Sequence, residues 1–187
     1  FEMSTITSGN SGINAYYADT KFSQCQFFGF NDYGRLFQSY ENKLIIENCS
    51  FNTEPEMMVY GQMTSSLDFV NNIVFQEQFK IDHIDDLIIE NQDFFEKGVD
   101  IWSSNGQILN SNFTSCNELV IMVDSLSISN SIFNSNTGLD IDVYDGLFEY
   151  SSFNDNHGGY LIGTNDNIVL DHCTFFGNTG QTLLYLT

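Results

Sequence analysis

Apolar and polar side chains alternate along this chain in short runs typical of β-strands. Residues 126–146 give the clearest example. One alternating run leads to Asn130, a second ends at Phe133, and a third follows an Asn/Gly segment and reaches Asp145-Gly146. Because alternate side chains of a strand point to opposite faces, each run has one apolar face. The stretch therefore predicts three short strands separated by corners and closed by an Asp-Gly turn.

This circuit repeats when the chain is aligned on the phenylalanine of the second strand. Subtraction of residue numbers gives copies 19 to 24 residues apart, each with an apolar residue five positions before the Phe. Several columns that stay in register over eight copies indicate a repeat protein. The phenylalanines are Phe27, Phe51, Phe75, Phe94, Phe113, Phe133, Phe153 and Phe175, and the asparagines three positions earlier are Asn48, Asn72, Asn91, Asn110 and Asn130.

One copy is too short to bury its own apolar face, whereas copies stacked in parallel about 4.8 Å apart bury a continuous core. Asparagine suits the corners because it tolerates left-handed backbone, and its amide can bond to the next copy. We expect an all-β parallel β-solenoid of eight to nine rungs with three short strands each, roughly 40 Å long. Residues 1–19 form a degenerate first rung and 20–187 the regular rungs of a single domain.

The repeat Φ-x-Φ-x-Asn-x-x-Phe-x-x-Asn, followed by Gly and a third strand, resembles the right-handed parallel β-helix superfamily, which has the pectin-lyase-like fold. The resemblance covers about residue 20 to the end. It implies a single right-handed parallel β-helix. It leaves function open, because that superfamily includes lyases, hydrolases, adhesins and structural rods. The best matches are Phe133-x-x-Asn136, Phe153-x-x-Asn156 and Phe175-x-x-Asn178.

Charge narrows the classes of partner. The chain has 25 acidic and 5 basic residues, a formal net charge of −20. This charge argues against nucleic acid, anionic lipid surfaces and polyanionic substrates, and it favours cations or neutral glycans. No apolar run has transmembrane length, so we expect no membrane insertion. The chain begins without Met and without a signal-peptide pattern, and we expect a segment of a longer chain or fibre.

Acidic residues recur at the turns between copies. Asp, Asn and Ser are ordinary turn residues because their side chains bond the nearby backbone. Stacked carboxylates could instead bind Ca²⁺, which takes six to eight oxygen ligands. Turn chemistry and a calcium site thus stay open for Asp85, Asp124, Asp145 and Asp166.

Asp140 and Asp142 are the sharpest candidate for catalysis. They alternate with apolar residues on one strand, so both point outward roughly 7 Å apart, which is within the range for an inverting glycosidase. The equivalent positions of neighbouring copies lack further acids or bases. The superfamily's lyases use a basic residue near a calcium-acid cluster, and the basic residues here are scattered. We therefore predict no enzyme, with glycan cleavage as the main alternative. Those equivalent positions are Val120, Met122, Leu161 and Gly163.

Cysteines, sequons and aromatic residues complete the candidate chemistry. Cys25, Cys49 and Cys173 share an inward column, where small buried apolar residues are expected. A disulfide between the first two stays open. The triplets Asn48-Cys-Ser50 and Asn112-Phe-Thr114 are candidate glycosylation sites. The aromatics that could stack on sugars are Tyr16, Tyr17, Tyr60, Trp102 and Tyr144.

Together these features favour a structural β-helical rod of an extracellular or cell-surface assembly. We expect rods to associate end to end, or with neighbouring subunits of a fibre, through backbone pairing along the axis. The alternative function is a β-helix that binds or cleaves carbohydrate through surface carboxylates. A groove with clustered acids, a base and aromatics would favour this alternative over the rod.

Overall fold

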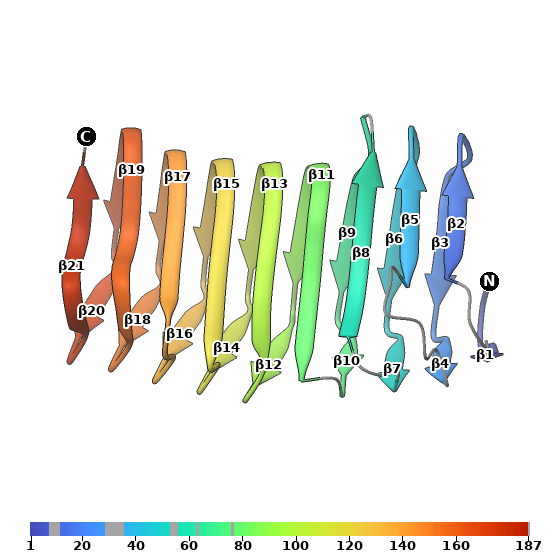
Figure 1. Cartoon of the computed structure of the whole chain (residues 1–187), viewed down its shortest axis with the longest axis horizontal. Coiled ribbons are helices and arrows are strands. Elements are labelled where there is room, and N and C mark those ends of the chain that lie inside the picture. Colours follow the sequence, from blue (N-terminus) through green and yellow to red (C-terminus); the bar gives the residue numbers. More distant parts are fainter. Residues whose placement is uncertain (8–11, 29–35, 53–55, 63, 76, 187) are drawn as a thin grey trace.

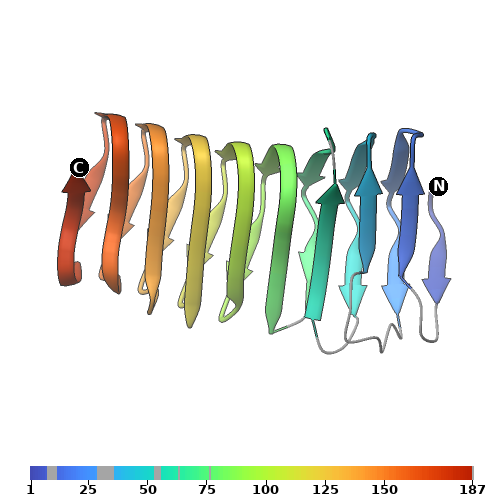
Figure 2. The ribbon, with the colours of Figure 1, turned by 45° about the horizontal axis from the view of Figure 1, so that its top comes forward.

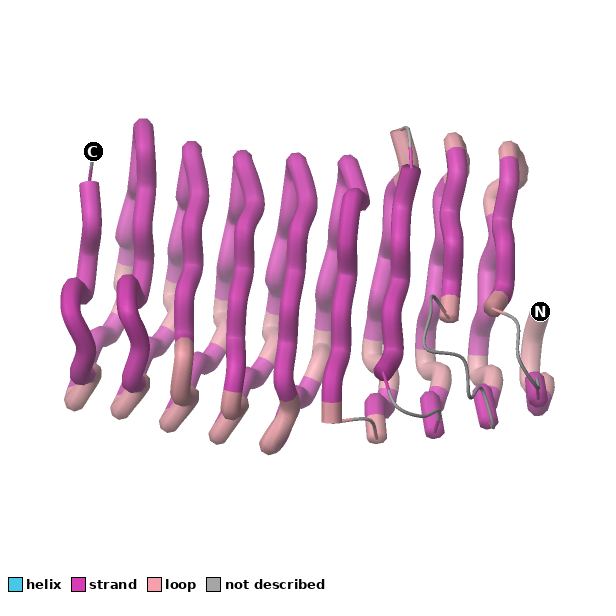
Figure 3. The backbone as a smooth tube through the Cα atoms, viewed as in Figure 1, coloured by secondary structure: helices cyan, strands magenta, loops and turns pink. Residues whose placement is uncertain are grey.

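The chain folds into a right-handed parallel β-solenoid of about eight turns, as the repeat predicts. A computed structural model describes residues 1–7, 12–28, 36–52, 56–62, 64–75 and 77–186. The strands stand side by side along a rod, with the N-terminus at one end and the C-terminus at the other (Figure 1). Figure 3 shows strands joined by short loops. Over the described residues, no helix is long and apolar enough to cross a membrane.

The front of the rod in Figure 1 is one continuous ladder of parallel strands. From β11 to β19 each strand of the ladder is long and bends over the top of the rod, so that its second half lies at the back. In order, the ladder contains β2 (Ile13–Tyr16), β5 (Phe37–Tyr40), β8 (Glu56–Gln62), β11 (Gln78–Glu90), β13 (Gly98–Leu109), β15 (Glu118–Ser129), β17 (Leu139–Glu149), β19 (His157–Asp171) and β21 (Thr179–Leu186).

In the first turns the back half is a separate strand, and a third row of short strands completes each turn. The back strands β3 (Thr20–Ser23), β6 (Lys43–Glu47) and β9 (Ser66–Val70) lead into the second half of β11. The short row is divided into two sheets. These are β1 (Thr5–Thr7), β4 (Gln26–Phe28), β7 (Ser50–Asn52) and β10 (Ile73–Val74), and then β12 (Asp93–Phe95), β14 (Asn112–Thr114), β16 (Ile132–Asn134), β18 (Ser152–Asn154) and β20 (Thr174–Phe176).

The predicted Asp-Gly turn does not interrupt the ladder. Asp145 pairs with Ser125 and Asn167, and Gly146 pairs with Leu126 and Ile168, so β17 continues through the bend. Two of the three predicted strands are therefore fused into one bent strand in the regular turns. The bend needs no chain reversal, because the strands on both sides of it pair with the same neighbouring turns.

A stack of phenylalanine rings fills the core, as the repeat predicts. Phe113, Phe133 and Phe153 are fully buried, and successive ring centroids are 4.8 Å apart with nearly parallel planes. This separation is the spacing of hydrogen-bonded strands, so each ring rests on the ring of the next turn. Phe175 continues the stack at 4.9 Å from Phe153.

The prediction is wrong by one residue in the third turn. Val74 pairs with Phe51 and is 9% exposed, whereas Phe75 is 60% exposed. The left-handed corner is Asn71, and Asn72 is buried. The sequence leaves this register ambiguous because residues 73–75 are all apolar and the two asparagines are adjacent.

The other corners follow the prediction, and a second asparagine column adds to them. Backbone φ is 50° to 53° at Asn48, Asn91, Asn110 and Asn130. The amide bond expected between corners occurs from Asn71 Nδ2 to Asn48 Oδ1, at 2.6 Å. At the opposite corner, the side chain of the buried Asn136 donates to Asn156 Oδ1 at 2.9 Å, and that of Asn156 donates to Asn178 Oδ1 at 3.0 Å. These amides join successive turns inside the rod.

Candidate ligand-binding groove

An open groove of about 830 Å³ lies across the bends of the long strands. The bends form the upper edge of Figure 1 and come forward in Figure 2. Its walls come from six neighbouring strands, β5, β8, β11, β13, β15 and β17. Five strand spacings give the groove a length of about 24 Å along the rod. An extended ligand lying parallel to the axis fits these dimensions.

The groove forms where strict alternation ends. In β11 the buried residues Ile81, Ile84 and Leu87 are three positions apart, with His83 in left-handed conformation between the first two. The register against β13 shifts between Ile81 and Ile84. Because two residues, not one, separate each buried pair, extra polar side chains point outward at the bend. Asp82 and Asp85 reach the groove in this way.

Exposed aromatic rings stand on the floor of the groove. Trp102 is 43% exposed and Tyr144 is 55% exposed, and both line the groove. The indole N–H of Trp102 donates to the carboxylate of Asp100, and Asp100 pairs with Lys80 at 3.0 Å. The hydrogen bond holds the indole in one orientation and leaves its ring available for contact.

The three other predicted aromatics lie beside the groove. The ring of Tyr60 packs against His83, with centroids 5.2 Å apart. Tyr16 and Tyr17 pack against Tyr40, which itself lines the groove, at 6.0 and 5.1 Å. Of the five aromatics that the sequence singles out, two line the groove and three pack against residues that line it.

The polar lining is acidic. Among the described residues, the carboxylates are those of Asp82, Asp85, Asp124 and Asp142, and Lys and Arg do not contribute. The basic group there is His83, whose Nδ1 lies 2.6 Å from Asp82 Oδ1. A ligand in this groove meets acceptors of hydrogen bonds and negative charge.

The two residues of the predicted catalytic pair differ in their access to the groove. Asp142 lines it and Asp140 does not. Burial, and then the charge of Asp142, raise the pKa of Asp140 above its ordinary value. Register places Asp140 beside Val120, and Asp142 between Met122 and Gly163. The paired positions thus lack acids and bases, as the sequence predicts, and the other carboxylates and the imidazole of the groove come from other positions of the neighbouring strands.

The four turn acids proposed for calcium do not converge. Register places Ser104 between Asp85 and Asp124, which makes these two acids about 10 Å apart. Asp145 belongs to the adjacent column and accepts a hydrogen bond from Asn167 Nδ2 at 3.0 Å. Within the described ranges, no three His, Cys, Asp or Glu residues form a group that could hold a metal ion. A calcium site at these acids, with Asp166 as the fourth, has no geometric support.

Both sequons are on the outer surface. Asn112 lies on the outward face of β14, where its Nδ2 donates to Asp93 at 3.2 Å and its Oδ1 accepts from Thr114 at 2.8 Å. Asn48 is exposed at its corner and bonds to Asn71. A glycan on either residue would require its amide to leave these contacts. Glycosylation stays a prediction.

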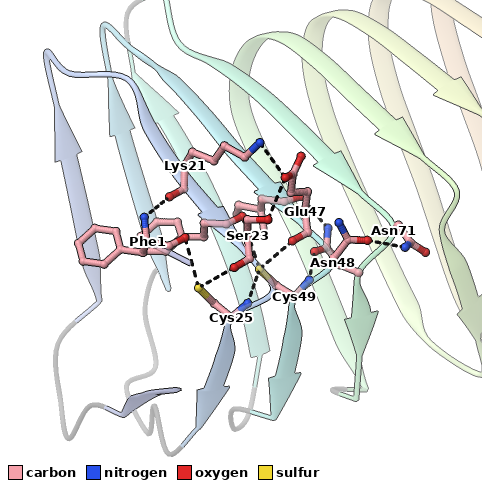
Figure 4. A network of polar contacts seen from close by, with 11 residues as sticks. Phe1, Lys21, Ser23, Cys25, Glu47, Asn48, Cys49 and Asn71 are labelled. Carbon is pink, nitrogen blue, oxygen red and sulfur yellow. Dashed lines mark hydrogen bonds and ion pairs between the residues drawn. The ribbon is translucent and has the colours of Figure 1, made fainter. Parts of the chain in front are cut away.

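Cys25 and Cys49 are buried, as the inward column predicts, and Cys173 is partly buried against the core. All three thiols are free, and Figure 4 shows the first two. The backbone N–H of Cys25 donates to Cys49 Sγ at 3.4 Å. Burial raises the pKa of the Cys49 thiol to about 11, so it is protonated at neutral pH and unreactive. Hydrogen bonds from Lys21 and Ser23 lower the pKa of the neighbouring Glu47. These contacts join two successive turns of the solenoid.

No family model matches the chain, and the search of curated proteins finds no match. The fold and the groove therefore carry the functional argument.

Proposed function

We propose that this chain forms an extracellular or cell-surface β-helical rod that binds an extended glycan in the groove. The observation that carries the proposal is the alignment of exposed aromatic rings and carboxylates along about 14 Å of the rod, within a groove about 24 Å long. We further propose membership of the right-handed parallel β-helix superfamily, in a non-catalytic, adhesin-type branch. The right-handed solenoid and the repeat support this assignment.

The lining has the chemistry that sugar recognition requires. The apolar face of a pyranose ring packs on an aromatic face, which Trp102 and Tyr144 offer. Carboxylates accept hydrogen bonds from sugar hydroxyls and fix the orientation of the ring. The stacked turns hold both kinds of group on a rigid scaffold, so little conformational entropy is lost on binding.

Removing the aromatic floor tests this proposal. We expect Trp102→Ala to weaken glycan binding roughly five- to tenfold in titration calorimetry, because a ring contact contributes about 1–1.4 kcal/mol. Phe95→Ala is the matched control, since Phe95 is an exposed ring on β12, away from the groove lining. Unchanged glycan binding by Trp102→Ala, or an equal loss in the control, would contradict the proposal.

Glycan cleavage is the second candidate, and the raised pKa of Asp140 beside Asp142 favours it. A carboxyl group with a raised pKa can act as general acid beside a second carboxyl group. The binding function predicts no release of reducing ends from oligosaccharides that bind. Release that disappears in both Asp140→Asn and Asp142→Asn would establish catalysis instead.

A further inference from the structure

We propose that the groove selects glycans that carry protonated amino groups, such as oligomers of glucosamine. This inference rests on the proposed glycan binding and adds the charge of the ligand. Three features of the groove support it: the sign of its charge, the spacing of its acids and the rigidity of its aromatic floor.

The negative charge of the groove is not balanced from within. Four carboxylates line its described part, against one imidazole. That imidazole, of His83, is held by Asp82, and the nearby Lys80 is held by Asp100. Any bound sugar displaces water from these carboxylates, which costs free energy. A neutral sugar offsets this cost with ordinary hydrogen bonds, whereas an ammonium group forms stronger, charge-assisted hydrogen bonds. The net charge of −20 adds a long-range attraction for cations.

The carboxylates form two rows that follow the rod axis. In one row, Asp142 pairs with Met122, Met122 pairs with Trp102, and Asp82 follows Ile81, the partner of Ile101. Three strand spacings therefore separate Asp82 and Asp142 by about 14 Å. In the other, Asp85 and Asp124 are about 10 Å apart. A polymer with an amino group on each sugar can reach acids in both rows while its rings contact the floor.

The aromatic floor favours such a glycan over a basic peptide. Trp102 is fixed by its bond to Asp100 and offers a flat apolar surface for a pyranose ring. An amino group borne on a sugar ring has few rotatable bonds, whereas each lysine side chain loses rotamer entropy on binding. An ammonium group near the indole face gains a further cation–π attraction.

The test compares three ligands by titration calorimetry at pH 6 and low salt: a glucosamine hexamer, its fully N-acetylated counterpart and a lysine hexapeptide. We expect the glucosamine hexamer to bind at least tenfold more tightly than the N-acetylated hexamer. We also expect 0.5 M NaCl to reduce this advantage, because salt screens the charges.

The variants locate the effect within the groove. The double variant Asp82→Asn, Asp142→Asn should remove the advantage of the amino oligomer, so that its affinity falls to that of the N-acetylated hexamer for the same variant. Asp93→Asn, on β12 away from the groove, should keep the advantage and serves as the charge control. Thermal melts check that each variant is folded.

The outcomes separate this inference from the proposed function. Equal affinity for the two hexamers would overturn the inference and leave glycan binding intact, as would an advantage that survives in the double variant. Binding of the lysine peptide alone, or of none of the three ligands, would overturn both.

Discussion

Asparagine has two different tasks in this molecule. Exposed asparagines such as Asn110 and Asn130 occupy left-handed corners, where a side chain that bonds the local backbone is tolerated. Asn136 and Asn156 are buried, and they join turns through side-chain and backbone hydrogen bonds. The same residue type thus turns the chain at one corner and links the stack at another.

Removing a buried amide tests the second task. In Asn156→Ala the backbone N–H of Asn136 and the carbonyl of Phe133 lose their partners inside the rod. We expect the free energy of unfolding to fall by about 2–4 kcal/mol, measured by denaturant titration. Asn134→Ala, on the outward face of β16, should change it by less than about 0.5 kcal/mol. Equal effects of the two variants would refute a special role for the buried amide.

Asp140 predicts a pH dependence of stability. Its pKa is raised in the folded state, so the folded state binds the proton more tightly than the unfolded state. This contribution is complete below the ordinary pKa of 3.8 and is lost as pH rises through the folded pKa. Asp140→Asn should therefore raise the melting temperature at pH 7 and leave it unchanged at pH 3. A gain of the same size in Asp93→Asn would assign the effect to net charge instead.

At the scale of elements, the long bent strands both build the ladder and carry the groove. Neighbouring strands approach closely at Gly158. A Cβ placed on Gly158 of β19 would lie 2.2 Å from the carbonyl oxygen of Leu139. On the same strand, a Cβ on Gly163 would meet Asp142 Oδ1 at 3.4 Å, an ordinary contact.

These two glycines form a matched pair. Gly158→Ala should destabilise the fold by roughly 1–3 kcal/mol, because a methyl group there collides with the backbone of β17. Gly163→Ala should be tolerated within about 0.5 kcal/mol. Thermal and denaturant unfolding of both variants checks this, and a stable Gly158→Ala variant would mean that the two strands separate more easily than their pairing suggests.

At the scale of the whole molecule, one parallel ladder runs the length of the rod, and the surface is strongly acidic. The same spacing and register from turn to turn are what a second copy would need to continue the ladder. The charge of −20 opposes this by repulsion between copies. End-to-end stacking stays a prediction, and ionic strength should control it.

Electron microscopy of the purified chain at rising salt tests the stacking. We expect filaments with an axial repeat of roughly 40 Å at high salt, and single rods at low salt, because screening removes the repulsion. Discrete particles at every salt concentration would contradict end-to-end association. That result would leave the groove as the molecule's functional surface.

The sequence by itself determined which side chains of each solenoid turn face the core. Alternation with period two and a phenylalanine in each copy predict which side chains are buried, as the stacked rings of Phe113, Phe133 and Phe153 confirm. The inward cysteines Cys25 and Cys49 follow from the same pattern. These features are local, because the neighbours of each residue are the equivalent residues of the next copies.

Only the tertiary structure decided the register of the third turn and the existence of the groove. Three apolar residues in a row left open whether Val74 or Phe75 is buried, and the pairing with Phe51 selects Val74. At the bends alternation stops, so the sequence pattern does not state which way Asp82 and Asp85 point. Asp82 and Asp85 line the same groove as Trp102 because the bends of neighbouring turns align. The stacking of the turns sets that alignment.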